Sequence, residues 1–399
     1  PVVLHGADHH TLWVNTKALE LCGLMGELPS VSVGSIDLDE FGVPTGVLRE
    51  WEAMQLVLSK MPQLTLEQEL DCLDWAQNRL LADGIVEIQD AWIDPGMTEV
   101  YLESARRGRL RVTANLAFRA DPLTWQADLP YFETVRKEVI ELNHPLLRVN
   151  AMKFFVDGVL GSSTASVLEP YVAGPSAHGH GEQVWKREEL LTAAQSANRA
   201  GYQLHLHAIG DAAVRTALDI IEAVEPFTPA VIAHTELVSD ADVPRFAKLN
   251  VTANFEPLWA REDGQLMSCV PQVGRKRIDS MYRMRDLHDA GARISFGSDW
   301  PVSSPAALLG LATAVNRSLP DGETWTGEQA LSTSESLKAY TSCSGFQMNP
   351  RANYGSLTIG QAAEFVVLSA NPFEVSNRDL FKIRVVAIST PANPLLSSL

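Results

Sequence analysis

The clearest indication of the fold class is the stretch at residues 202–236, YQLHLHAIGDAAVRTALDIIEAVEPFTPAVIAHTE. It joins a β-rich apolar run at 202–207 to a helical pattern at 211–223, and that helix to a second apolar run at 230–234. Two short strands with a helix between them are typical of a βαβ unit, in which the strands are parallel. The stretch therefore predicts an α/β protein.

The same alternation begins at about residue 84 and runs through most of the chain. Seven strands are predicted, and further helices are expected between them. A closed parallel barrel needs eight strands, and the open doubly wound alternative usually has a Gly-rich phosphate turn that is absent here. We predict a (β/α)₈ TIM barrel whose first strand is missing from the chain. The predicted strands are 84–89, 110–118, 147–155, 202–207, 230–234, 251–255 and 293–296, and the other predicted helices are 187–200, 240–249 and 283–290.

The two ends of the chain differ in sequence pattern from the barrel segment, which we assign to residues 84–350. Residues 1–83 combine helical segments with Gly/Pro loops, and we interpret them as an insertion ahead of the second barrel strand. Residues 351–399 contain GSLTIGQAAEFVVLSANP and an apolar run at 384–388. These runs predict short antiparallel strands that form the C-terminal part of a small β-sandwich module.

Composition limits the partners. The 32 basic and 49 acidic residues give a net charge of -17, which disfavours nucleic acid, and no apolar run reaches the roughly 18 residues of a membrane span. The cysteines have no CxxC spacing and predict neither a zinc ribbon nor a disulfide framework. No leader is evident at the start of the chain, so a cytoplasmic location is expected. The cysteines are Cys22, Cys72, Cys269 and Cys343.

Residues with metal-ligand chemistry end four of the predicted strands. Lys153 lies in RVNAMKFFVDG, His207 in YQLHLHAIGD, His234 in AVIAHTE and Asp299 in ISFGSDWP. The C-terminal ends of parallel barrel strands meet at one mouth, so these side chains are expected to converge there. Two imidazoles and a carboxylate suit Zn²⁺.

The triplet HLH offers two histidines on one face of a strand, because side chains alternate with period two. His207 is nearer the strand end and is the preferred ligand, which leaves His205 to fill the barrel interior or support the site.

The ordered series K…DG…TA, HAIGD, AHTELV and GSDWPV resembles the amidohydrolase superfamily, specifically the amidohydrolase family 3 subgroup that includes N-substituted formamide deformylases. The resemblance begins at PVVLHGADHHTLWVNTKAL and covers nearly the whole chain. It implies that a carboxylated Lys153 bridges two metals, that His207 and His234 hold one of them, and that Asp299 is both a ligand and the catalytic base. Members of this family carry a His-x-His at the end of the first barrel strand, and this segment is expected to be missing here.

Other positions receive weaker assignments. The resemblance places His10 in a loop near the active-site mouth, and we assign Asp157, Trp300 and Arg317 with His10 to substrate binding. Glu50 and Asp90 end motifs that the family also shows. The pair His178 and His180 has metal-ligand spacing but lies in a Gly/Pro-rich loop, which favours a substrate lid.

We therefore expect a hydrolase of an amide-like C–N bond in a small N-acyl or N-formyl amine, with one or two divalent metal ions. A deaminase of amino-heterocycles, an inactive fragment and a small-molecule binding module remain alternatives, and metal stoichiometry separates the first of these. Without the His-x-His strand, at most about one metal, low solubility and weak activity are expected. The sequence leaves the oligomeric state open, with a homodimer as one of the alternatives.

Overall fold

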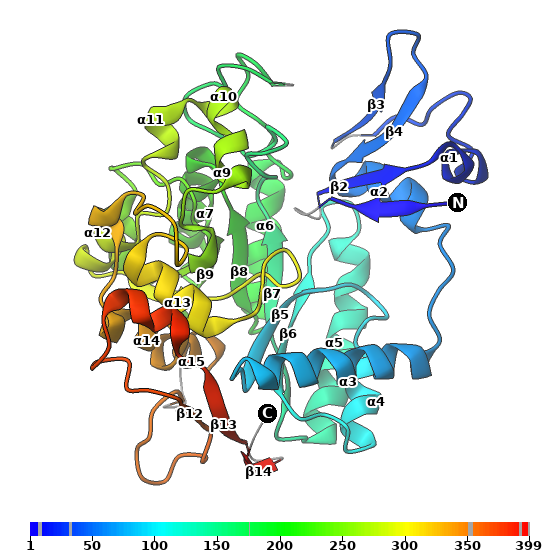
Figure 1. Cartoon of the computed structure of the whole chain (residues 1–399). Coiled ribbons are helices and arrows are strands. Elements are labelled where there is room, and N and C mark those ends of the chain that lie inside the picture. Colours follow the sequence, from blue (N-terminus) through cyan, green and yellow to red (C-terminus); the bar gives the residue numbers. More distant parts are fainter. Residues whose placement is uncertain (7–9, 32–33, 175, 350–353, 391–392, 398–399) are drawn as a thin grey trace.

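The computed structural model of the chain describes residues 1–6, 10–31, 34–174, 176–349, 354–390 and 393–397 (Figure 1). Within these residues, no helix combines the length and the apolar character needed to cross a bilayer. The expected boundary between residues 350 and 351 lies outside the described residues.

A seven-stranded parallel sheet forms the centre of the molecule, with the strand order β11-β10-β9-β8-β7-β6-β5. Each strand pairs with the next one along the chain, as expected for consecutive βα units. The α/β class and the barrel-type sheet are thereby confirmed. The strands are β5 Glu87–Ile93, β6 Thr113–Arg119, β7 Leu147–Phe155, β8 Gln203–Ala208, β9 Val231–His234, β10 Thr252–Phe255 and β11 Arg293–Phe296.

The helices between the strands cover the outside of the curled sheet (Figure 1). The predicted helices are present with small shifts, and the segment predicted at 240–249 is the shorter helix α8, which has Pro244 in its first turn. The helices are α3 Leu66–Ala82, α4 Glu99–Arg106, α5 Trp125–Leu142, α6 Arg187–Arg199, α7 Asp211–Val224, α8 Val243–Lys248, α9 Gly264–Ser268, α10 Val270–Val273, α11 Arg275–Ile278, α12 Met284–Asp289, α13 Ala307–Asn316, α14 Thr333–Tyr340 and α15 Ser342–Met348.

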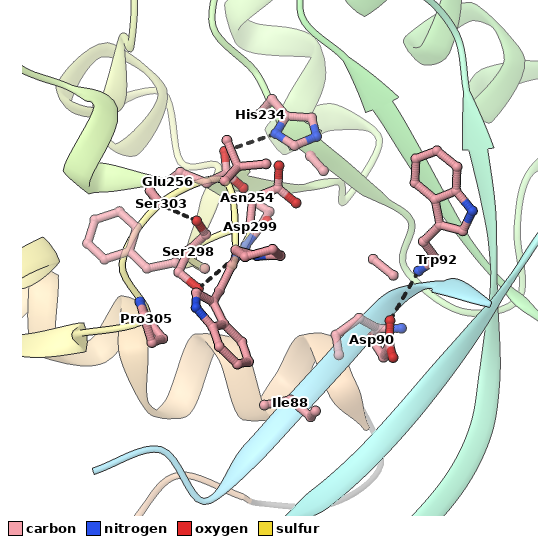
Figure 2. Close-up of a pocket in the computed structure, with 18 of the residues that line it drawn as sticks. Ile88, Asp90, Trp92, His234, Asn254, Glu256, Ser298, Asp299, Ser303 and Pro305 are labelled. Carbon is pink, nitrogen blue, oxygen red and sulfur yellow. Dashed lines mark hydrogen bonds and ion pairs between the residues drawn. The ribbon is translucent and has the colours of Figure 1, made fainter. Parts of the chain in front are cut away.

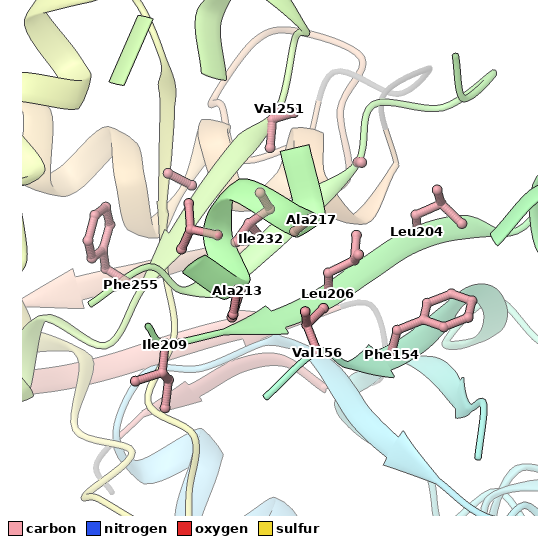
Figure 3. Close-up of a cluster of buried hydrophobic side chains, with 14 of the residues drawn as sticks. Phe154, Val156, Leu204, Leu206, Ile209, Ala213, Ala217, Ile232, Val251 and Phe255 are labelled. Carbon is pink, nitrogen blue, oxygen red and sulfur yellow. The ribbon is translucent and has the colours of Figure 1, made fainter. Parts of the chain in front are cut away.

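Strand β8 shows why the sheet has two different faces. Leu204 and Leu206 are fully buried in the hydrophobic cluster that also contains Ala213 and Ala217 of α7 (Figure 3). Because side chains alternate along a strand, the intervening histidines of the HLH triplet face the other side. The leucines pack against the helix layer, and the histidines face the interior of the curled sheet.

The sheet does not close on itself within the described residues, because β5 and β11 are its edge strands and do not pair with each other. A cavity of about 2190 Å³ extends from the C-terminal ends of the strands into the space between these edges. It is larger than the roughly 300–1,000 Å³ of an ordinary small-molecule pocket.

A second, antiparallel sheet forms the N-terminal unit, which we define as residues 1–58. Its strand order is β1-β2-β4-β3, and Leu12, Val14 and Leu48 form its core with α1 and α2. Helical segments and loops were expected here from the sequence, and this sheet was not predicted, because its strands have only three to six residues and Gly/Pro turns separate them. The elements are β1 Val3–His5, β2 Thr11–Val14, α1 Thr16–Cys22, β3 Ser35–Leu38, β4 Pro44–Arg49 and α2 Glu50–Leu58.

The C-terminal segment forms a third, antiparallel sheet with the order β12-β13-β14. Its strands are β12 Phe365–Leu368, β13 Val385–Thr390 and β14 Asn393–Ser397. The expected short antiparallel strands are therefore present. This sheet meets the start of the barrel sheet, where a Cβ on Gly84 would lie 2.9 Å from Val385 and 3.3 Å from Val366.

Candidate metal centre

Four of the predicted site residues meet at one rim of the parallel sheet. The ring centroids of His207 and His234 lie 4.5 Å apart, since β8 and β9 are neighbours in register. Lys153 and Asp299 line the same cavity, and the charge of Asp299 acts on both Lys153 and His234. Figure 2 shows His234 at the end of β9 and Asp299 in the turn after β11, both facing the cavity opposite Asp90 and Trp92 of β5.

Lys153 is buried in this cavity and does not extend to bulk water. Burial lowers the pKa of its ammonium group to about 8, and the Asp299 and Glu256 carboxylates oppose the shift only in part. A lysine with a lowered pKa has a larger neutral fraction, and the neutral amine is the form that can react with carbon dioxide to give a carbamate.

His207 is held as a neutral imidazole. Burial lowers its pKa well below the ordinary value, and the positive charges of His234 and Lys153 act in the same direction. Its Nε2 lies 3.1 Å from the carbonyl oxygen of Gly158, which can only accept a hydrogen bond, so Nε2 carries the proton. His207 therefore presents Nδ1 as its unprotonated nitrogen.

His234 has the opposite arrangement. Its Nδ1 lies 3.1 Å from Oε2 of Glu256, so Nδ1 donates to the carboxylate and Nε2 is left as the ligand nitrogen (Figure 2). Burial lowers the pKa of His234, but the Glu256 carboxylate outweighs burial and the pKa is raised. The ring also stacks on Trp259, with centroids 5.7 Å apart.

Glu256 is a functional candidate that was not predicted from the sequence. It directly follows β10, so the strand-end rule that selected His207 and His234 selects it too. A carboxylate that orients a histidine ligand is a common feature of metal sites. Glu236, two residues after His234, is a second buried carboxylate in the cavity wall, and burial raises its pKa to about 8.

Asp157 is buried beside this centre, and its carboxylate accepts hydrogen bonds from backbone N–H groups. It accepts hydrogen bonds from the backbone N–H groups of Ser166 at 2.8 Å, Ile209 at 3.1 Å and Gly210 at 2.9 Å. Burial nevertheless raises its pKa to about 7. The carboxylate thus ties the loop after β7 to the loop after β8, next to His207 at 3.6 Å. The predicted contact with substrate remains untested.

Gly210 of the HAIGD motif is required by this junction. A Cβ at this position would lie 1.9 Å from the carbonyl oxygen of Ser166, a distance that no real contact reaches. The glycine allows the two loops to approach closely enough for the hydrogen bonds to Asp157.

The remaining predicted substrate residues lie in different places. His10 lines the cavity, with its ring centroid 6.1 Å from that of His207, and Trp300 lines it beside Trp75. Arg317 does not line the cavity in the described part of the chain. Its guanidinium is fully buried, bonds to Thr326 Oγ1 at 2.6 Å and lies over the Trp325 ring, which does not support a substrate contact.

His178 and His180 are also outside the cavity lining that the described residues form. The Nδ1 of His180 lies 2.9 Å from the carbonyl oxygen of Val167, and the backbone of Val167 bonds back to His180. These two hydrogen bonds hold the loop around His180 against the segment around Val167. The role of this loop as a substrate lid remains a prediction.

The donor set fits a divalent cation in its chemistry. Among the described residues, no group of three or more His, Cys, Asp or Glu side chains has the arrangement of a formed metal site. Two adjacent imidazoles, each with one nitrogen fixed as a hydrogen-bond donor, and a nearby carboxylate are nevertheless the ligands that Zn²⁺ prefers. In addition, Nδ1 of the buried His205 has no hydrogen-bond partner within the described residues.

Comparison with known proteins identifies the family. The model of the amidohydrolase family matches residues 1–388. The chain belongs to the amidohydrolase family. The resemblance seen in its strand-end motifs is thereby confirmed, and this amidohydrolase-family chain shares the fold of solved relatives.

Three relatives illustrate the similarity. Protein LONG AFTER FAR-RED 3 of Arabidopsis thaliana is 27% identical over 397 residues, which are 95% of this chain and 66% of the plant protein. N-substituted formamide deformylase of Arthrobacter pascens is 26% identical over 395 residues, which are 97% of this chain and 71% of that enzyme. An uncharacterized metal-dependent hydrolase of Pyrococcus horikoshii superposes with a TM-score of 0.74 at 28% identity, covering 94% of this chain and 73% of that one. The chain thus spans about two thirds to three quarters of the length of these three proteins.

Proposed function

We propose that this chain carries the active site of a metal-dependent hydrolase that cleaves the amide-like C–N bond of small N-acyl or N-formyl amines. The observation that carries the proposal is the meeting of Lys153, His207, His234 and Asp299 at one rim. The similarity to an N-substituted formamide deformylase and to metal-dependent hydrolases supports it.

The hydrogen bonds of the two histidines support a choice of ligand atoms. Nδ1 of His207 and Nε2 of His234 would hold one divalent ion, preferably Zn²⁺, with an oxygen of Asp299, and a carboxylated Lys153 would add anionic oxygens. When bound, the metal lowers the pKa of a coordinated water and polarises the scissile carbonyl. Because histidine binds metal in its neutral form, the raised pKa of His234 predicts tighter binding as pH rises.

The chain itself supplies proton transfer and orientation. Asp299 would accept the proton of the attacking water and pass it to the leaving nitrogen, which must be protonated to depart as an amine. Glu256 keeps His234 in one tautomer and orientation. The partly buried Trp259 ring, stacked on His234, limits the access of bulk water to that side of the site.

The test is metal content and hydrolysis measured together. Purified chain would be assayed for bound metal and for release of acid and amine from N-formyl and N-acetyl alkylamines, with amino-heterocycles as the deaminase comparison. His207→Ala and His234→Ala should each lower kcat/KM at least about 100-fold and reduce bound metal, as expected when a ligand is lost.

A matched control is Glu188→Gln, which changes an exposed carboxylate of α6 outside the cavity lining. Its activity should equal that of the unchanged chain. Ammonia release from amino-heterocycles, or hydrolysis that survives the loss of both histidines, would show that the proposed reaction is incorrect.

A further inference from the structure

We infer that His10, supplied by the N-terminal unit, hydrogen-bonds the scissile amide, and that Glu50 and Thr164 are positioning residues that hold it there. The inference rests on the proposed function and names residues outside the strand-end set. It makes the N-terminal unit a wall of the active site.

Glu50 holds His10 by two hydrogen bonds. Nδ1 of His10 donates to Oε2 of Glu50 at 2.8 Å, and the backbone N–H of Glu50 donates to the carbonyl oxygen of His10 at 2.8 Å. The two side chains are only 17% and 8% exposed, so bulk water screens their interaction little. An imidazole oriented by a buried carboxylate is an arrangement that enzymes use to bond to a substrate or exchange a proton with it.

Thr164 joins this pair to the barrel. Its Oγ1 donates to Oε1 of Glu50 at 2.6 Å, across 114 residues of sequence, and accepts from the backbone N–H of Val159 at 3.0 Å. Both carboxylate oxygens of Glu50 therefore accept a hydrogen bond, one from His10 of the N-terminal unit and one from Thr164 of the barrel. The carboxylate cannot turn away from His10 without losing a buried bond, which costs about 1–3 kcal/mol.

Gly158 brings the contact next to the metal ligands. A Cβ at Gly158 would lie 2.2 Å from Oγ1 of Thr164 and 2.8 Å from Oε1 of Glu50, so a larger residue would separate them. The carbonyl oxygen of the same glycine bonds Nε2 of His207. One backbone residue thus separates the Glu50 carboxylate from the ring expected to hold metal.

Backbone strain marks the same position. Glu50 has φ 62°, in the left-handed region that is unfavourable for a residue other than glycine. Such strain costs on the order of 1–3 kcal/mol and is concentrated at functional sites. Here it accompanies the turn from β4 into α2, from which the carboxylate reaches both His10 and the barrel.

The position of His10 completes the inference. Its ring lines the cavity and its centroid lies 6.1 Å from that of His207. A substrate whose carbonyl is held near His207 and His234 therefore places its amide group beside His10. We expect the imidazole to bond to that group and orient it for attack.

A double-mutant cycle tests whether Glu50 acts through His10. His10→Ala should lower kcat about 100-fold and Glu50→Gln about 10-fold. Glu50→Gln should have no further effect when His10 is already Ala, because the positioned group is gone. Thr164→Val should lower kcat several-fold, and Thr164→Ser, which keeps the hydroxyl, should restore it. Glu188→Gln, at an exposed carboxylate of α6 outside the cavity lining, is the control and should leave activity unchanged.

Two further measurements separate this inference from the proposed function. Nitrogen NMR of histidine-labelled, ligand-free protein should show His10 with its proton on Nδ1, and Glu50→Gln should remove that signature. Binding of N-formyl-butylamine, followed by tryptophan fluorescence, should weaken in His10→Ala with the same non-additive pattern.

Additive effects of His10→Ala and Glu50→Gln would overturn the inference, and so would a His10→Ala chain with unchanged kcat and binding. In either case, hydrolysis by the unchanged chain would still support the proposed function. If the unchanged chain neither hydrolyses nor binds any amide, the proposed function fails and this inference fails with it.

Discussion

Lys153 lies in surroundings that a lysine side chain does not favour by itself. It is buried at the end of β7, and its ammonium group approaches the Phe155 ring at 5.1 Å. Burial of a cation is unfavourable unless it is neutralised or chemically changed. Conversion to a carbamate would replace the positive charge with anionic oxygens suited to divalent ions, which gives a physical reason for a lysine here.

Lys153→Ala should lower kcat/KM at least about 100-fold, because a metal ligand would be lost. Added acetate should restore part of the activity by placing a carboxylate in the vacated space. Hydrolysis with and without acetate checks this, and Lys186→Ala, at a side chain that is 81% exposed, is the control. A variant that acetate leaves unchanged would speak against a carboxylate-like role for this position.

Single elements are stabilised by local features that can be examined separately. Helix α14 begins with a capping box between Ser332 and Glu335, and Glu335 also bonds Arg285 of α12 through both carboxylate oxygens at 2.7 and 3.1 Å. This pairing links two helices on the outside of the barrel. Arg285 is the main cause of the lowered pKa of Glu335, which falls to about 2.

Glu335→Gln should keep the capping box, since glutamine also serves at this position, and lose the ion pair. The free energy of unfolding at pH 7 should fall by about 1 kcal/mol. The pKa of Glu335 is lowered on folding from 4.5, so its contribution is complete above pH 4.5 and is lost as pH falls towards 2. Urea unfolding of both proteins from pH 7 to pH 3 should show the difference shrinking.

Glu262→Gln is the matched control for this experiment. Glu262 pairs with Arg275 on the surface, where its side chain is 42% exposed, and its loss should change stability little. A difference between the Glu335→Gln protein and the unchanged chain that stayed constant with pH would contradict the assignment of the effect to the Arg285 pair.

At the scale of the whole molecule, the candidate site depends on elements that are distant in sequence. The proposed ligands come from β7, β8, β9 and the turn after β11, and His10 comes from the separate N-terminal unit. An unfolded chain cannot present this set together. Metal binding should therefore be coupled to folding, with affinity for the folded state alone.

Removal of metal by a chelator should lower Tm, and added Zn²⁺ should restore it. Binding to the folded state contributes about 2.7 kcal/mol when free metal is 100 times Kd. Differential scanning calorimetry with and without chelator checks this. His234→Ala should abolish the shift, and His178→Ala, outside the cavity lining, should retain it. An equal response to chelator in both variants would show that the metal binds elsewhere.

Most of the barrel could be read from the sequence because its signals are local. The predicted strands at 147–155 and 293–296 match β7 and β11 residue for residue, and the alternation around His207 indicates which face each side chain takes. The short strands of the N-terminal unit could not be read this way, since three to six residues between Gly/Pro turns carry little periodic signal.

The parallel α/β architecture and the positions of Lys153, His207, His234 and Asp299 at or near strand ends follow from the sequence alone, because period-two alternation is a property of short segments. The family follows from the resemblance of the strand-end motifs. The groups that surround these residues follow from the three-dimensional packing. The Glu256 carboxylate beside His234, the complete burial of Arg317 and the bond between Glu50 and Thr164 across 114 residues depend on the packing of separate elements. Such contacts form only when the chain folds, and no local pattern records them.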